Sequence, residues 1–247
     1  MTAGPKHTLT IAVRDPLTAT GTQFAQPHWQ QGRAIHQRNR DGARIQALQQ
    51  SYPCCEYLLG APLFLQIAQQ FVPTVAFGTA LEQIGAQLSH WFSQQPQAQP
   101  ILADHPFLLG LLRFEWGWHR SYHAPRWRKL QPEHYQAWLQ QPDQPLPWQL
   151  NSGLSLCRSR YPVAAIWRTL TQQRTQQAVD ELLIEASAPS LWLLYPTATD
   201  VAITPITSAQ LAGLQQLKRP WRTANRAISA PLVATALQHH WLVATDQ

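Results

Sequence analysis

Apolar positions recur at helical spacing through the first half of the chain. The clearest stripe lies in segment 61–72 and consists of Leu63, Phe64, Ile67, Ala68 and Phe71. Segments 79–92 and 103–124 repeat this spacing, and the second of them is the longest candidate helix, with Asp104 as its expected N-cap.

Weaker helical signals come before these segments. Segment 29–52 carries a sparse apolar stripe, and segment 54–60 reads as a short helix that ends at Gly60. The pattern predicts a bundle of about five helices within a domain over residues 29–130, after an irregular arm over residues 1–28.

The pattern changes in residues 131–247, which are predicted to form a second domain. Short strands are expected within 148–159, 190–196 and 200–206, and helices within 208–217 and 229–244. Ser208 and Ser229 are the expected helix caps, and the proline-rich segment 141–148 is a connector. The predicted fold class is α+β: an N-terminal helical bundle followed by a small C-terminal domain with a short antiparallel sheet and helices on one face.

The composition indicates a folded protein with few charges. The chain has 247 residues, of which 45% are hydrophobic and 13% charged, and glutamine supplies much of the polar surface. The net charge of +6 is compatible with nucleic acid, an acidic peptide or a membrane surface as partner. The sequence has no apolar run long enough to span a membrane, no secretory signal and no disulfide framework, so a cytoplasmic location is expected.

One helix face raises the question of a metal site. Glu115, His119 and His123 fall at i, i+4 and i+8, and two histidines one turn apart can ligate zinc or iron. The alternative is a polar helix face in which Glu115 pairs with a nearby arginine. We expect no metal in this chain, because the carboxylate that metallopeptidases place beside the first histidine is missing.

Other reactive groups are sparse. Adjacent Cys54 and Cys55 are expected to be buried thiols, since vicinal cysteines bridge only with strain. Arg38, Arg40 and Arg44 suggest DNA contact or, alternatively, a solvated face that supports the loop beneath it. No phosphate-binding or nucleophile motif occurs, so the residues by themselves give only weak evidence of catalysis.

The apolar run 190–196 suggests a peptide-binding strand. If it is an edge strand, its backbone can accept an extended peptide, and the expected contact residues are Trp192, Leu193, Leu194 and Tyr195. The alternative is an ordinary interior strand.

Several weak motifs occur in an order that resembles the HvfC/BufC-type family, which includes the methanobactin-biosynthesis partner protein MbnC. The matching residues are Arg38, Asn39, Leu48, Tyr52, Pro53, Leu59, Gly60, Phe64, Ala68, Phe71, Leu81, Gly85, Leu88, Phe92, Phe114, Glu115, Trp116, Tyr122, Ala124, Pro162, Val163, Ile166 and Trp167. The sequence departs from the family at Pro196, where the family has arginine, and in segment 217–221. These departures favour the methanobactin-type branch or another specialised branch.

The resemblance implies a non-catalytic partner, in a heterodimer, of a TIM-barrel multinuclear iron oxidase. Such proteins hold the leader of a ribosomally made precursor peptide and present its cysteine to the iron of the oxidase, and in the methanobactin branch the modified peptide binds copper. No cofactor is expected in this chain, and nucleic acid and membrane are not expected partners. The residues expected to contact the oxidase are Arg113, Glu115, Trp116, His119, Arg120 and His123. A DNA-binding transcriptional regulator is the alternative function.

Overall fold

The computed structural model describes four stretches of the chain: residues 25–140, 148–172, 190–217 and 230–244. The chain divides into two compact units, Met1–Ala43 and Arg44–Gln247. Helix α1 begins at Ala25, inside the segment expected to be irregular. Three predicted features lie outside the described residues: the rest of the arm over 1–24, the connector over 141–147 and the cap at Ser229.

Helices occupy most of the described residues before Trp148. In chain order they are α1 (Ala25–Ser51), α2 (Pro53–Leu59), α3 (Ala61–Phe71), the 3-10 helices η1 (Val72–Thr74) and η2 (Leu81–Gln87), α4 (Leu88–Ser93), α5 (Ala98–Asp104), α6 (Leu108–Tyr122) and α7 (Pro132–Gln140). The later elements are β1 (Trp148–Leu150), β2 (Ser155–Ser159), α8 (Val163–Gln172), β3 (Ser190–Pro196), β4 (Val201–Pro205), α10 (Ser208–Leu217), α11 (Ala230–Gln238) and β5 (Leu242–Ala244). The α+β class is confirmed, with the helical part first.

One predicted helix end is confirmed and another is wrong. Gly60 separates α2 from α3 with a φ of 78°, as the sequence indicated. The expected helix over 103–124 is instead interrupted, and Asp104 is the last residue of α5 rather than a cap. Pro106 explains the break, since proline lacks an N–H and disfavours helical backbone in the residue before it.

The cap of α10 also differs by one residue. The Thr207 hydroxyl accepts a hydrogen bond from the Gln210 N–H at 3.1 Å, and the Gln210 carboxamide oxygen accepts one from the Thr207 N–H at 2.8 Å. This reciprocal pair is a capping box, so Thr207 and not Ser208 caps the helix.

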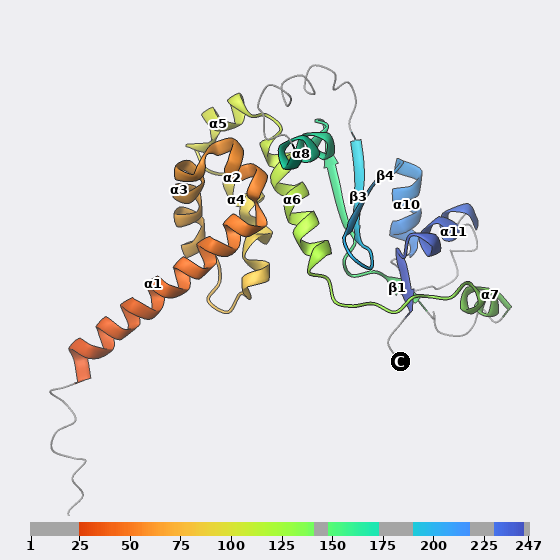
Figure 1. Ribbon diagram of the computed structural model, residues 1–247, viewed down its shortest axis with the longest axis horizontal. Coiled ribbons are helices and arrows are strands. Elements are labelled where there is room, and N and C mark those ends of the chain that lie inside the picture. Colours follow the sequence, from red (N-terminus) through yellow and green to blue (C-terminus); the bar gives the residue numbers. More distant parts are fainter. Residues whose placement is uncertain (1–24, 141–147, 173–189, 218–229, 245–247) are drawn as a thin grey trace, which may run out of the picture. The chain divides into compact units, whose positions relative to one another are not determined.

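Helix α6 lies between helices α2 and α4 on one side and the main sheet on the other (Figure 1). Its glycines allow the close approach to the sheet. A Cβ built on Gly117 would lie 3.2 Å from Ser155 Cβ, and one built on Gly110 would lie 2.9 Å from both Ser159 Oγ and Val163 Cγ1. Because α6 contacts both the bundle and the sheet, it positions side chains from each part relative to the other.

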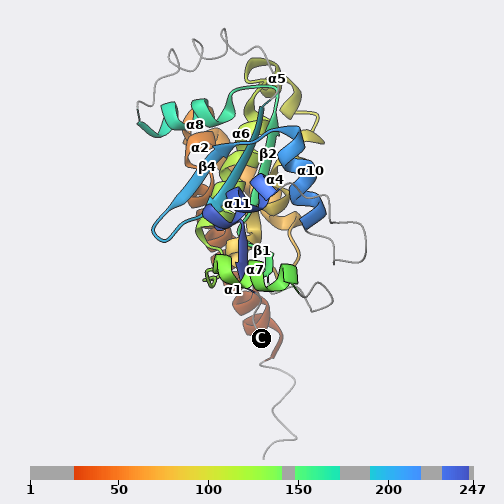
Figure 2. The same cartoon turned by 90° about the vertical axis from the view of Figure 1, so that its right-hand side faces the viewer.

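The main sheet has the antiparallel order β2–β3–β4, and both of its faces are covered. Leu194 of β3 packs with Phe114 of α6, whereas Leu193 and Tyr195 pack with Leu214 of α10. The second face carries α10 and α11, which lie in front of the strands in Figure 2. The expectation of helices on one face only is therefore wrong. A second, two-stranded sheet pairs β1 with β5.

The expectation that segment 190–196 is an edge strand is also wrong. Strand β3 pairs with β2 on one side and with β4 on the other, so its backbone cannot accept a further strand. Leu193, Leu194 and Tyr195 are buried, and Trp192 is half-buried. These residues form the core of the sheet, and we withdraw them as a peptide-binding set.

Enlarging Gly110 is expected to destabilise the protein. In Gly110→Ala the new methyl group must displace Ser159 or Val163, and overpacking of this kind lowers the free energy of unfolding by about 1–3 kcal/mol. Gly42→Ala is the matched control, because nothing lies within 4 Å of its Cβ position in α1 and alanine favours helix. Urea unfolding measures the free energy of unfolding of both variants. Equal stability of the two variants would contradict the close packing of α6.

Candidate functional site

A large open pocket lies beside the C-terminal half of α6. Its volume is about 1130 Å³. Its walls come from the end of α3, the loop after η1, η2, α4 and the end of α6, and they include Phe71, Thr74, Val75, Ala76, Thr79, Glu82, Gln83, Ile84, Ala86, Gln87, His90, Trp91, Gln94, Trp116, Arg120, His123, Ala124, Pro125 and Ser152. We call it the α6 pocket.

The α6 pocket combines aromatic surfaces with neutral hydrogen-bonding groups. Phe71, Trp91 and Trp116 supply the aromatic surface. Three glutamines and several hydroxyl groups supply donors and acceptors without charge. Glu82 and Arg120 are the charged side chains among the lining residues. Two histidines, His90 and His123, also line the pocket. Such a lining suits a polar chain with apolar side chains better than a row of phosphates.

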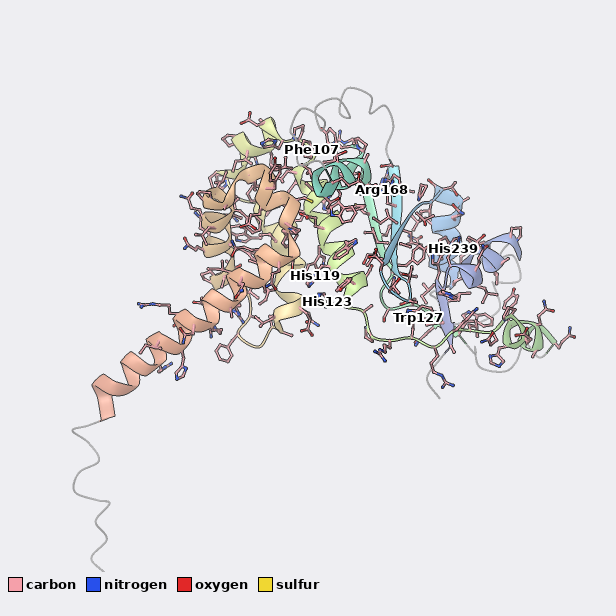
Figure 3. The ribbon with its side chains drawn as sticks, viewed as in Figure 1. Phe107, His119, His123, Trp127, Arg168 and His239 are labelled. Atoms are coloured by element: carbon pink, nitrogen blue, oxygen red, sulfur yellow. The ribbon has the colours of Figure 1, made fainter. Side chains whose placement is uncertain are left out.

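The rings of Trp116, His119 and His123 lie next to one another along α6, and Trp116 and His123 line the pocket. The Trp116 ring centroid lies 5.3 Å from that of His119, and the centroids of His119 and His123 are 4.5 Å apart. Figure 3 shows the two histidines one turn apart at the C-terminal end of α6. Burial, and then the neighbouring His123, lower the pKa of His119. Both effects favour the neutral form of His119.

A buried arginine holds one wall of the pocket in place. Arg44 is 3% exposed, and its guanidinium donates hydrogen bonds to three successive carbonyls, those of Val75 (3.4 Å), Ala76 (2.9 Å) and Phe77 (2.8 Å). The Phe77 residue itself is 81% exposed at the tip of this loop. Because its donors point at backbone carbonyls, Arg44 supports a loop and does not present its charge to a nucleic acid. Arg40 pairs with Asp41 at 3.3 Å.

Removing the Arg44 guanidinium is expected to loosen the loop. Arg44→Met leaves three carbonyls without their donor and lowers the free energy of unfolding by about 2 kcal/mol. Chymotrypsin should then cut after the exposed Phe77 faster than in the parent protein. Arg40→Met is the control, since a surface ion pair contributes little. Unchanged cleavage in Arg44→Met would show that the loop does not depend on this contact.

Glu115 was expected at the oxidase interface, but it is buried. It is 2% exposed, and its carboxylate accepts hydrogen bonds from the backbone N–H groups of Cys54 (2.8 Å) and Cys55 (3.0 Å) at the start of α2. Burial raises the pKa of Glu115 to about 7, although hydrogen bonds from Cys54 and Cys55 oppose the rise. The assignment of Glu115 as an interface residue is wrong, because it joins α6 to α2 inside the protein.

The two cysteines beside Glu115 are buried thiols, as expected. Burial, followed by the nearby Glu115, raises the pKa of Cys55 well above its ordinary value. A protonated, inaccessible thiol is a poor nucleophile.

The structure does not assemble the metal-ligand set considered for α6. Glu115 is engaged by α2, and the His119 ring nitrogens lie 3.3 Å from Ser51 Oγ and from the Glu82 carbonyl oxygen. In the part of the chain that the structure describes, no group of three or more His, Cys, Asp or Glu side chains is placed to hold a metal ion.

The remaining residues expected at the interface fall into two groups. Trp116, Arg120 and His123 line the α6 pocket, and His119 stacks on Trp116. Arg113 is exposed on α6 but does not line the pocket. The opposite walls of the pocket were not predicted; the signal for them in the sequence is the glutamine-rich polar side of segment 79–92.

Comparison with known proteins adds no assignment. The chain matches no protein-family model and no curated protein. Among the residues that can be described, each helix is too short or too polar to cross a membrane.

Proposed function

We propose that this chain is a non-catalytic partner protein that binds an extended peptide in the α6 pocket and presents it to a TIM-barrel multinuclear iron oxidase. The observation that carries the proposal is the α6 pocket itself, which Trp116, Arg120 and His123 help to line. The identity of the oxidase rests on the resemblance of the sequence to the HvfC/BufC-type family. In this proposal the peptide is the precursor of a methanobactin-like product that binds copper, and the heterodimer works in the cytoplasm.

The size and lining of the pocket support a peptide as ligand. Its volume of about 1130 Å³ exceeds the range of about 300–1,000 Å³ that is usual for small-molecule sites. Carboxamides such as Gln83 and Gln87 can donate to a peptide carbonyl and accept from a peptide N–H. Trp91 and Trp116 offer flat surfaces for apolar side chains. A peptide uses all of these features together.

The proposed contribution to the reaction is positioning. The oxidase supplies the iron and the oxidation chemistry, and this chain holds the leader so that the cysteine stays near the iron. Fixing two reactants in one complex replaces a bimolecular encounter by an effectively unimolecular step. This lowers the activation free energy by several kcal/mol.

Filling the pocket tests the proposal. Ala86 is exposed and lines the α6 pocket, so Ala86→Trp places an indole in the binding space without removing a core contact. Ala61→Trp is the control, because Ala61 is exposed on α3 and is not part of the lining. We expect a short cysteine-containing precursor peptide to be encoded beside a gene for the oxidase. This peptide is the ligand, and calorimetry measures its binding to each protein.

We expect Ala86→Trp to weaken peptide binding at least tenfold, that is by about 1.4 kcal/mol or more, and Ala61→Trp to leave it unchanged. Equal binding by both variants would place the peptide elsewhere. Salt-sensitive binding of duplex DNA by the parent protein, without peptide binding, would support the regulator instead.

A further inference from the structure

A second pocket lies on the other side of the short segment that follows α6. Its volume is about 620 Å³, and Ala124 and Pro125 line both pockets. The walls of the second pocket include Tyr122, Arg126, Trp127, Thr197 and Asp200. Tyr122 is 55% exposed. The two pockets thus adjoin across a ridge made by Ala124 and Pro125.

The far wall of the second pocket is an ordered turn between β3 and β4. The Thr197 N–H donates to the Asp200 carbonyl at 2.7 Å, and the Thr197 hydroxyl accepts from the Asp200 N–H at 3.0 Å. The Asp200 carboxylate accepts from the Val201 N–H at 2.7 Å. The turn is therefore tied together by its own hydrogen bonds, and one carboxylate oxygen of Asp200 is already engaged.

Positive charge follows the ridge. Residues 116–132 contain Arg120, Arg126, Arg128 and Lys129 and no aspartate or glutamate. Arg120 lines the α6 pocket and Arg126 lines the second pocket, and both are exposed. The acidic lining residues, Glu82 and Asp200, each belong to one pocket only. The ridge between the pockets therefore has a cation on each side.

We propose that one extended peptide crosses the Ala124–Pro125 ridge from the α6 pocket into the second pocket, and that acidic side chains of this peptide pair with Arg120 and Arg126. This inference rests on the proposed function and specifies the chemical class of the peptide. Tyr122 and Trp127 receive an apolar side chain in the second pocket, as Trp116 does in the first. Charge complementarity to Arg120 and Arg126 selects an acidic peptide, and a peptide that reaches both pockets across the ridge must be extended.

Synthetic peptides test the charge requirement on the full chain. The probe is a fluorescein-labelled peptide of twelve residues that contains four glutamates, two phenylalanines, glycine and serine. A matched probe carries glutamine at the four glutamate positions, and a twelve-nucleotide oligothymidine is the competitor. Fluorescence anisotropy at low and at physiological salt gives the affinities. We expect the glutamate probe to bind at least tenfold more tightly than the glutamine probe.

Arginine variants then test which cations of this protein bind the glutamate probe. Arg126→Gln and Arg120→Gln should each weaken binding of the glutamate probe roughly fivefold. Arg113→Gln is the control on the same helix, exposed but outside both pockets, and should change binding less than twofold. Because Arg120 also donates to the Ser152 and Leu154 carbonyls at 3.2 Å, Arg120→Lys, which keeps the charge, should restore part of the affinity.

The outcomes separate this inference from the proposed function. Equal binding of the two probes, or equal loss in the Arg113→Gln control, would overturn the acidic peptide while leaving peptide binding in the α6 pocket intact. Binding of neither probe by a protein that also fails to bind the encoded precursor would remove both proposals. Displacement of the glutamate probe by oligothymidine at equal concentration and physiological salt would assign the ridge to single-stranded nucleic acid.

Discussion

Replacing Glu115 by alanine is expected to lower the free energy of unfolding by about 3–5 kcal/mol, the largest effect of any single change that we predict. The substitution leaves the N–H groups of Cys54 and Cys55 buried without an acceptor, and each unsatisfied group costs about 1–3 kcal/mol. It also opens a small void between α6 and α2. Urea unfolding at pH 6 measures the loss.

The control for this variant is Glu133→Ala, because Glu133 is exposed on α7. A surface substitution of this kind changes stability by less than about 0.5 kcal/mol. A loss below about 1 kcal/mol in Glu115→Ala would mean that the carboxylate does not join α6 to α2 in solution.

The second large effect is a pH dependence that belongs to the same carboxyl group. Burial raises the pKa of Glu115 from 4.5 to about 7. Between these values the folded protein keeps a proton that the unfolded chain has released, so stability falls as pH rises from about 4.5 to about 7. The contribution of Glu115 to this fall is roughly 3 kcal/mol.

Glu115→Gln isolates this contribution, since glutamine resembles the protonated acid and does not titrate. His119 and His240 have lowered pKa values, so they make stability rise with pH and oppose Glu115 in the parent protein. The readout is therefore the stability difference between the parent and Glu115→Gln at pH 5 and at pH 8. We expect Glu115→Gln to gain roughly 3 kcal/mol relative to the parent over this range. A difference that stays constant would show that the carboxyl group titrates normally.

The helical periodicity of the sequence predicted the local structure well where one face of a helix is buried. The stripe from Leu63 to Phe71 became α3, and Gly60 ended α2, because each signal depends on neighbours in the chain. Pro106 marks the break between α5 and α6, but the helical spacing on both sides of it predicted one continuous helix. Helix α8 was missed, although Pro162 comes directly before its first residue.

The environment of β3 could not be decided from its own residues. Leu193, Leu194 and Tyr195 form a continuous apolar run, which is typical of a strand buried on both faces and fits an interior position. Whether such a run has one neighbour or two depends on β2 and β4, which lie elsewhere in the chain. The edge-strand interpretation failed for this reason.

The candidate site was predicted only on α6. Trp116, Arg120 and His123 stood out because they lie close together in the sequence, but the facing walls come from segments at least 22 residues away along the chain. The burial of Glu115 had no local signal either, since its partners Cys54 and Cys55 are about 60 residues earlier. Pockets and buried polar contacts of this kind are properties of the packing between elements.

Reconstitution of the reaction tests the central claim most directly. The encoded precursor peptide is incubated in air with iron-loaded oxidase, with this chain, or with both, and its mass is measured. We expect modified peptide only when both proteins are present, and strongly reduced product when the chain carries Ala86→Trp. A change in the mass of the peptide with this chain alone, or equal product with the oxidase alone, would contradict a non-catalytic partner that works by holding the peptide.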